Sequence, residues 1–335
     1  MKNMFMILGD NSFMDECNGE HKNMNVAIGI DQNYISPAVV MLVSLLENND
    51  IIVTLFILNN KLSDDDINIF VSLLKKYNSK NEVVNIKVES DWTKGAPKYS
   101  YIPVETYFNV VAPKYLPLDI DRVLYLDPDI IINKSIEGFY HQNLEGVCIV
   151  AARDQYITEN DRDIRDKLKI KGYTEYINAG VILFNLEFCR EKVNVDWYIN
   201  QLTTTFSMMK YANQDLLNIM YDNMIRVCSS NYNYQVPRAP KNKNLLNSIE
   251  NNVKIFHYTS WRKPWKLPYP GKFDYIYWKY SLMVGNKDEY QKYKKQKYVK
   301  LLIWKIKRFT EELFVMGKIV ARKLVNKLST KIIKK

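Results

Sequence analysis

Short apolar runs alternate with amphipathic segments through the first half of the chain. The runs are continuous and rich in Val, Ile and Leu, which is typical of strands buried on both faces of a parallel sheet. The amphipathic segments open with Ser36 and Ser63, both suited to be helix N-caps. This pattern predicts an α/β fold with a mostly parallel sheet covered by helices on both faces. Strands are expected at residues 25–30, 51–58, 82–88 and 122–126, and helices at 36–49 and 63–77.

The second half of the chain is expected to extend the same domain. It adds two apolar runs of strand length, a helix with one apolar face, and a short strand that leads into an aromatic and basic loop. These elements are expected at residues 146–154, 178–186, 213–221 and 254–265. The expected organisation is a polar leader (residues 1–23), one domain (24–287) and a C-terminal tail (288–335).

The positive charge of the chain is concentrated in that tail. The 335 residues are 47% hydrophobic and carry a net +10, but residues 291–335 hold 15 Lys and Arg against 2 Glu, a net +13. Since 10 minus 13 is −3, the other 290 residues carry a net −3. The main body lacks the basic footprint of a nucleic-acid-binding protein, so no nucleic-acid partner is expected.

The cysteines and the apolar runs bear on the compartment. Four scattered cysteines form no CxxC pair, so they indicate neither a zinc site nor a disulfide framework. Cys148 and Cys189 lie in apolar runs and are expected in the core. The apolar run at residues 4–8 is too short for a signal peptide, and no run approaches the roughly 20 residues of a membrane span. We therefore expect a cytoplasmic protein.

Two carboxylates separate two apolar runs in the stretch RVLYLDPDIIINKSI. Asp127 and Asp129 flank Pro128, directly after an expected strand. One interpretation is a turn, because Asp-Pro is common turn chemistry. The other is a site for Mg²⁺ or Mn²⁺, because side chains two apart in an extended segment share a side and paired carboxylates favour a cation. Asp31 also follows a strand, at the edge where α/β sheets bind ligands, which favours the metal interpretation.

Five motifs follow one another along the chain: IDQNY, RVLYLDPD, YINAGVILFNL, NQDLLN and HYTSWRKPW. In this order and spacing they resemble the family 8 retaining glycosyltransferases. The resemblance covers most of the chain and implies a GT-A fold. It implies transfer of a hexose from a UDP-sugar, UDP-glucose or UDP-galactose, with Mn²⁺ (alternatively Mg²⁺) as cofactor. The acceptor would be a glycan or lipid-linked glycan in cell-surface polysaccharide or lipopolysaccharide biosynthesis.

The resemblance also assigns roles to single residues. It implies three metal ligands: Asp127, Asp129 and His257. Two carboxylates and an imidazole suit Mn²⁺. The residues implied to bind the nucleotide are Gly29, Asp31, Asn33, Tyr34, Pro128, Ser260 and Lys263. The residues implied to lie near the transferred sugar are Asp154, Asn178, Gln214 and Asp215.

Simpler interpretations remain open for several of these residues. Asp31 and Asn33 could shape a turn, and Asp154 could pair with Arg153. Gln214 and Asp215 could be ordinary residues at a helix start, Asn178 could cap a strand, and Lys263 could be a solvated charge. The sequence also departs from the family pattern at Asn109, where an Arg is frequent, at Asn213, where an Asp is frequent, and at Ser260, where a Gly is frequent.

The motif residues are compatible with two mechanisms, and two other protein classes are alternatives to a glycosyltransferase. UDP would leave with support from the metal and Lys263, while Gln214 and Asp215 stabilise a developing oxocarbenium; the alternative is a covalent intermediate on Asp215. A sugar-nucleotide pyrophosphorylase would need a Gly-rich, basic phosphate loop after the first strand, which IDQNYISP is not. A catalytically degenerate membrane scaffold is the non-enzyme alternative, because Asn109 and Asn213 depart from the pattern. Replacing Asp129 by Asn is expected to abolish transfer with little change in stability, because it relieves repulsion.

The tail combines an apolar stripe with many basic residues. Its apolar residues recur at steps of three and four, as on one face of a helix. They are Leu302, Ile306, Phe309, Leu313, Met316, Val320 and Leu324. A helix packed on the domain is one interpretation; an anionic membrane surface is the other, and the net charge favours it. We therefore expect a peripheral protein on the inner face of the cytoplasmic membrane.

Overall fold

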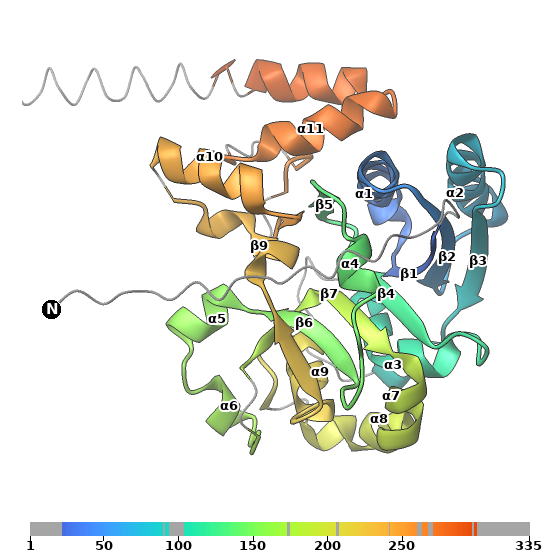
Figure 1. The fold of residues 1–335 in the computed structure, drawn as a ribbon, viewed down its shortest axis with the longest axis vertical. Helices are drawn as coiled ribbons and strands as arrows, with labels where there is room; N and C mark the ends of the chain where they lie inside the picture. The colour runs from blue at the N-terminus through green and yellow to red at the C-terminus, as the bar shows by residue number, and fades with distance from the viewer. Residues whose placement is uncertain are drawn as a thin grey trace, which may run out of the picture.

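A central sheet of seven strands organises the computed structural model of the protein (Figure 1). The strand order is β3-β2-β1-β4-β7-β6-β8, and only the pairs that β7 forms with β4 and β6 are antiparallel. The predicted α/β fold with a mostly parallel sheet is confirmed. The strands are β1 (Lys22–Gly29), β2 (Ile51–Asn59), β3 (Glu82–Lys87), β4 (Arg122–Leu126), β6 (Ile149–Arg153), β7 (Ile177–Asn185) and β8 (Ile225–Cys228).

The structure describes most of the chain. The described residues are 22–89, 91–93, 104–172, 175–205, 208–240, 242–259, 263–266, 271–296 and 298–299, with only the backbone at 22, 201–205 and 238. Residues 1–21, Ser260 and the tail from residue 300 onward therefore lie outside the described residues, and the last two residues of the expected leader belong to β1. Among the helices that are described, none is long and apolar enough to cross a lipid bilayer.

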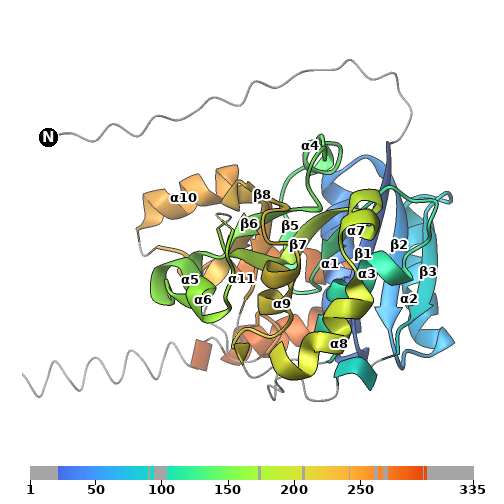
Figure 2. The same ribbon diagram turned by 90° about the horizontal axis from the view of Figure 1, so that it is seen from below.

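Helices cover both faces of the sheet because its strands are apolar on both sides (Figures 1 and 2). In β4, Val123 and Tyr125 pack on one side, and Leu124 and Leu126 pack on the other. The first side carries α3 (Phe108–Tyr115), α7 (Leu186–Lys192), α8 (Val195–Thr205) and α9 (Asn213–Met220), together with Cys148 and Cys189, which are buried as predicted. The second side carries α1 (Ile35–Asn48), α2 (Asp64–Tyr77) and the short α4 (Glu137–Tyr140).

Of the two serines predicted to be helix N-caps, only Ser63 has that role. Ser63 caps α2 in a capping box, in which its side chain accepts from Asp66 N while the Asp66 carboxylate accepts from Ser63 N, as expected for this first turn. The expectation that Ser36 caps α1 was wrong, because Ser36 lies inside that helix. Asp31 caps a 3-10 turn (Gln32–Tyr34) by accepting from Tyr34 N, and that turn runs directly into α1 at Ile35. The helical path therefore starts before Ser36.

A second, smaller layer packs on the outer side of α1. It holds the three-stranded sheet β5-β10-β9, with β10 antiparallel to β5 and parallel to β9. Figure 1 shows the small sheet beside α1, with α10 and α11 above it, and both β5 and α11 contact α1. The elements of this layer are β5 (Ile130–Ile132), β9 (Tyr234–Gln235), β10 (Ile255–His257), α10 (Lys243–Asn252) and α11 (Asp274–Met283). Two short helices, α5 (Gln155–Asn160) and α6 (Ile164–Lys167), form a separate lobe with its own small apolar cluster.

The helical residues after α11 belong to this packed layer. Residues 287–296 are helical. The rings of Tyr290 and Tyr293 lie 5.5 Å and 4.9 Å from that of Trp278 in α11. The expected boundary between the domain and the tail, after residue 287, therefore falls at the start of a helix that packs on the domain.

Candidate active site

A cavity of about 700 Å³ opens at the carboxyl ends of the parallel strands. Gly29 ends β1, and Asp127 and Asp129 follow β4, so both strands deliver residues to this edge. Because β7 runs the other way, the start of that strand meets them there, with Asn178 and Gly180. Open α/β sheets bind ligands at this edge. The cavity therefore lies where the sequence placed the site.

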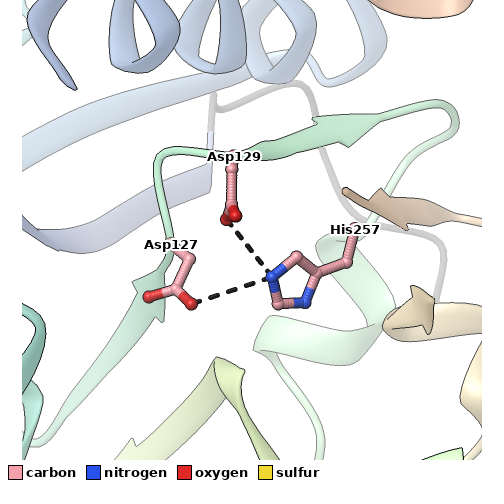
Figure 3. A group of neighbouring side chains, drawn as sticks. All are labelled: Asp127, Asp129 and His257. Atoms are coloured by element: carbon pink, nitrogen blue, oxygen red, sulfur yellow. Dashed lines mark ion pairs between the residues drawn. The ribbon is translucent and has the colours of Figure 1, made fainter. Parts of the chain in front are cut away.

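Strand register brings His257 to the two carboxylates. In the small sheet His257 pairs with Ile130, the residue after Asp129. The main chain of Asp127 is held in turn by β7, because Asp127 N donates to Gly180 O at 2.8 Å. Figure 3 shows the three side chains converging from these two sheets. His257 lies 128 positions after Asp129 and 130 after Asp127, so only this pairing makes the cluster.

The three side chains form a compact group of possible metal ligands. Each offers one atom, and these atoms lie within 4.8 Å of one another. His257 Nε2 lies 3.2 Å from Asp129 Oδ1 and 3.8 Å from Asp127 Oδ2. Asp129 Oδ1 is buried and accepts no hydrogen bond within the described chain, which is an unfavourable state unless a cation is bound. Two oxygens and one nitrogen therefore fit a divalent cation such as Mn²⁺.

The two carboxylates differ in their electrostatics. Burial, and then repulsion from Asp129, raises the pKa of Asp127 to about 7. Burial acts in the same direction on Asp129, but attraction by Lys263 and His257 outweighs it, so the pKa of Asp129 lies below its ordinary value. Lys263 is itself buried; its Nζ is paired with Asp129 Oδ2 and donates to Tyr258 O at 2.7 Å. The loop lysine thus supplies the positive charge beside Asp129.

Asn233 and Gly180 determine how the His257 ring is placed. Neither residue was predicted to be a site residue from the motifs. His257 Nδ1 lies 2.8 Å from Asn233 Oδ1, an atom that can only accept, so Nδ1 donates and Nε2 faces the carboxylates. Gly180 leaves room for the ring, because a β-carbon there would overlap His257 Cε1 and lie 2.9 Å from Asp127 Oδ2. Gly180 stands inside the motif YINAGVILFNL and was within reach of sequence analysis, whereas Asn233 lies in a loop without a recognisable pattern.

A network of amides centred on Asp154 forms another part of the cavity wall. Asp154 is buried, and its Oδ2 accepts from Asn178 (2.9 Å), Gln214 (3.1 Å) and Gln235 (2.8 Å). Its Oδ1 caps α5 by accepting from Ile157 N. Arg153 pairs with Glu175 instead, so the proposed Asp154–Arg153 pair is not present. The structure therefore brings three of the four predicted sugar-site residues together.

Asp215, the fourth, lies apart from them. It is fully buried, and it is absent from the residues that line the cavity in the described part of the chain. Tyr176 OH donates to its Oδ1, and the backbone N–H groups of Lys210 and Tyr211 donate to its Oδ2 at 2.6 and 2.7 Å. Burial raises the pKa of Asp215. These contacts hold the segment before α9 in place, and with it Gln214.

The loop after β1 is built as a turn. Asp31 accepts from Asn33 Nδ2 at 2.8 Å and from Tyr34 N at 3.2 Å. Tyr34 lines the cavity, whereas Asp31 and Asn33 do not line it in the described structure. The rings of Tyr34 and Trp265 are nearly perpendicular, with 6.3 Å between their centres, and Lys266 Nζ lies 6.0 Å from the centre of the Tyr34 ring. Gly29 is required here, because a β-carbon would lie 2.7 Å from Glu105 O. The remaining predicted residue, Pro128, also lines the cavity.

Comparison with known proteins identifies the family. The sequence profile described as glycosyl transferase family 8 matches residues 25–267, which include all three residues of the carboxylate–histidine cluster. The chain belongs to this family. Among family 8 relatives, it is 26% identical to a lipopolysaccharide 1,2-glucosyltransferase of Escherichia coli, over 73% of this chain and 74% of that protein. It is also 26% identical to a lipopolysaccharide 1,3-galactosyltransferase of Salmonella typhimurium, over 72% of both chains.

Solved structures agree with the GT-A fold predicted for this family 8 glycosyltransferase. The galactosyltransferase LgtC, solved in complex with donor and acceptor sugar analogues, superposes with a TM-score of 0.66 at 21% identity. The match covers 77% of this chain and 95% of LgtC. The glycosyltransferase GlyE of Streptococcus pneumoniae gives a TM-score of 0.61 at 20% identity, over 78% of this chain and 61% of GlyE. At these identities the likeness shows the fold alone.

Proposed function

We propose that this family 8 enzyme is a metal-dependent, retaining hexosyltransferase that uses UDP-glucose or UDP-galactose as donor. The observation that supports the proposal most is the cluster of Asp127, Asp129 and His257, open to a cavity large enough for a nucleotide sugar. An intact cluster also favours an enzyme over the alternative of a degenerate scaffold. The acceptor is proposed to be a glycan or glycolipid of lipopolysaccharide or another cell-surface polysaccharide, in line with the names of the relatives.

The cluster would hold Mn²⁺ or Mg²⁺ through one atom of each side chain. A bound divalent cation would neutralise negative charge on the diphosphate of the donor. Lys263 and Lys266 both line the cavity, and their ammonium groups suit a diphosphate. Tyr34, Gly29 and Pro128 would contact the nucleotide. Asp31 and Asn33 would shape the loop that presents Tyr34, and Ser260, which lies outside the described residues, stays a predicted contact.

The sugar would lie against the network of Asp154, Asn178 and Gln214. In the proposed reaction the bond between the anomeric carbon and UDP breaks, and the acceptor oxygen bonds to that carbon from the same face. The acceptor proton passes to a phosphate oxygen of the departing UDP. Gln214, held by Asp154 and the N–H of Ala179, would stabilise the charge that develops on the sugar. A covalent intermediate on Asp215 would require this carboxylate to leave its three hydrogen bonds, so we propose a positioning role for it.

A donor screen tests this function. The purified protein is incubated with UDP-glucose, UDP-galactose and the UDP-N-acetylhexosamines, and released UDP is measured with Mn²⁺, with Mg²⁺ and with EDTA. We expect release from a UDP-hexose that depends on the cation. If no donor is hydrolysed and calorimetry detects no UDP binding, the protein is a scaffold. Turnover that is unaffected by EDTA would contradict the metal assignment.

We further propose a peripheral location on the cytoplasmic face of the membrane. The support is the sequence alone: a net +13 over residues 291–335 and an apolar stripe at helical spacing. Most of this segment lies outside the described residues. An acceptor linked to lipid would be met at such a surface.

A further inference from the structure

Asn213 differs from the other carboxamides that line the cavity. Asn178, Gln214 and Gln235 use both the nitrogen and the oxygen of their amides in hydrogen bonds within the protein. Asn213 Nδ2 donates to Asn109 Oδ1 at 3.1 Å, but its Oδ1 accepts no hydrogen bond from any residue that the structure describes. Of these four carboxamides in the described cavity wall, Asn213 is therefore the one whose oxygen remains available to accept a hydrogen bond from a ligand.

The orientation of that oxygen is set by a chain of two amides. Asn109 is fully buried in α3, and its Nδ2 lies 3.4 Å from the carbonyl oxygen of Ala179 in β7. A carbonyl can only accept, so Asn109 must turn its nitrogen to Ala179 and its oxygen to Asn213. Asn213 must then turn its nitrogen to Asn109 and its oxygen away from it. The backbone of β7 thus fixes both side chains.

The two residues are also two of the three departures from the family motifs; Asn213 lines the cavity and Asn109 lies buried behind it. Positions 109 and 213 frequently carry Arg and Asp in the pattern described above, and here both are neutral amides in mutual contact. One neutral replacement alone would leave a buried charge without its partner, which is strongly unfavourable. Both together leave an uncharged pair. The cavity here offers one oriented acceptor and no net charge.

We propose that Asn213 determines donor-sugar specificity and that Asn109 positions it. This inference rests on the proposed function. Asn213 Oδ1 accepts a hydrogen bond from one hydroxyl group of a neutral hexose. A donor that presents a second acceptor at this point, such as a carboxylate or an acetamido carbonyl, or that lacks the hydroxyl, is disfavoured because the oxygen then stays unpaired.

Monodeoxy analogues of the preferred UDP-hexose test the inference. The readout is kcat/KM for release of UDP by the wild type, Asn213→Ala, Asn109→Leu and the double variant. For the wild type we expect a deoxy analogue to react roughly tenfold more slowly than the parent, the effect of losing one hydrogen bond. Asn213→Ala should lose that discrimination at one hydroxyl position only. Asn109→Leu should lose it at the same position, with UDP affinity unchanged.

The double variant separates positioning from general damage. Because Asn109 acts through Asn213, adding Asn109→Leu to Asn213→Ala should change donor discrimination no further. Asn81→Leu is the matched control; Asn81 is equally buried, but it bonds to Val53 N and Leu74 O near the start of β2. It should lower thermal stability and leave donor discrimination intact. If Asn213→Ala does not fold, Asn213→Ser takes its place.

Two results would overturn the inference. One is UDP release with wild-type discrimination by Asn213→Ala or its serine substitute. The other is loss of discrimination at different hydroxyl positions in the Asn109 and Asn213 variants. Absence of UDP release from every donor with the wild type would instead overturn the proposed function, and this inference with it.

Discussion

His257 rests against the α-carbon of Gly180, because a side chain at residue 180 would overlap its imidazole ring. Gly180→Ala should therefore displace His257 and Asp127 and weaken Mn²⁺ binding by about 10- to 100-fold, the range for disturbed ligand orientation. Calorimetry with MnCl₂ measures the effect, and UDP release should fall with it. Gly138→Ala is the control, since a β-carbon at that position meets nothing within 4 Å. Unchanged Mn²⁺ affinity in Gly180→Ala would remove His257 from the metal site.

The two aspartates should respond differently to neutralisation. Both Asp127→Asn and Asp129→Asn should abolish cation-dependent turnover. Asp129→Asn should also lower the free energy of unfolding by roughly 3 kcal/mol, because it leaves the buried Lys263 without its counter-charge. The sequence alone suggested little change in stability for this variant, and the position of Lys263 reverses that expectation.

Asp127→Asn should leave the stability of the metal-free protein equal or higher above pH 7. The pKa of Asp127 is raised to about 7 by burial and by Asp129, so its ionisation destabilises the fold as pH rises. The contrast is measured by denaturant unfolding of both variants at about pH 6 and about pH 8, which bracket this pKa. Equal stability losses in the two variants would contradict the assigned electrostatics.

Asn233 should matter for metal binding although it is not a ligand. Asn233→Leu removes the acceptor of His257 Nδ1, so the ring loses its fixed orientation. We expect Mn²⁺ affinity to fall by about 10- to 100-fold while the protein remains folded. Asn231→Leu is a matched control in the same loop, because the Asn231 side chain is exposed. Equal Mn²⁺ affinities for the two variants would show that the ring needs no such support.

Asp31 should affect the nucleotide and not the metal. Asp31→Ala removes the cap of the turn that carries Tyr34, worth about 1 kcal/mol, and should weaken UDP binding without changing the dependence on Mn²⁺. Asp31→Asn keeps an acceptor for Tyr34 N and should restore most of the UDP affinity if the cap is what matters. Calorimetry that finds the same UDP affinity in wild type and Asp31→Ala would leave Asp31 as a turn residue alone.

The membrane proposal is best tested with a chain that ends at Val299. This chain keeps Tyr290 and Tyr293, which pack on Trp278, so the domain should stay intact. It should release UDP as the full chain does but no longer sediment with phosphatidylglycerol vesicles at low salt. A full-length protein that ignores these vesicles would assign the tail to packing.

The sequence by itself determined the fold class and most of the cluster. Continuous apolar runs predicted β1, β2 and β4, because strands buried on both faces cannot alternate with polar residues. The Ser63 cap was readable because its contacts are local, within one turn. Asp127 and Asp129 stood out because side chains two apart share a side. His257 was reached only through the resemblance of the motif HYTSWRKPW.

Tertiary structure alone decided which distant residues meet. The direction of β7 brings Gly180 to His257, and the register of β10 on β5 brings His257 to Asp129, over separations that no local pattern encodes. The contact between Asn109 and Asn213 is of the same kind: two separate departures in the sequence are one hydrogen-bonded pair in the fold. Burial decides the rest, because it makes Asp215 a structural carboxylate and Lys263 the counter-charge of Asp129. Charge type can be read from a sequence, but its surroundings depend on long-range strand pairing.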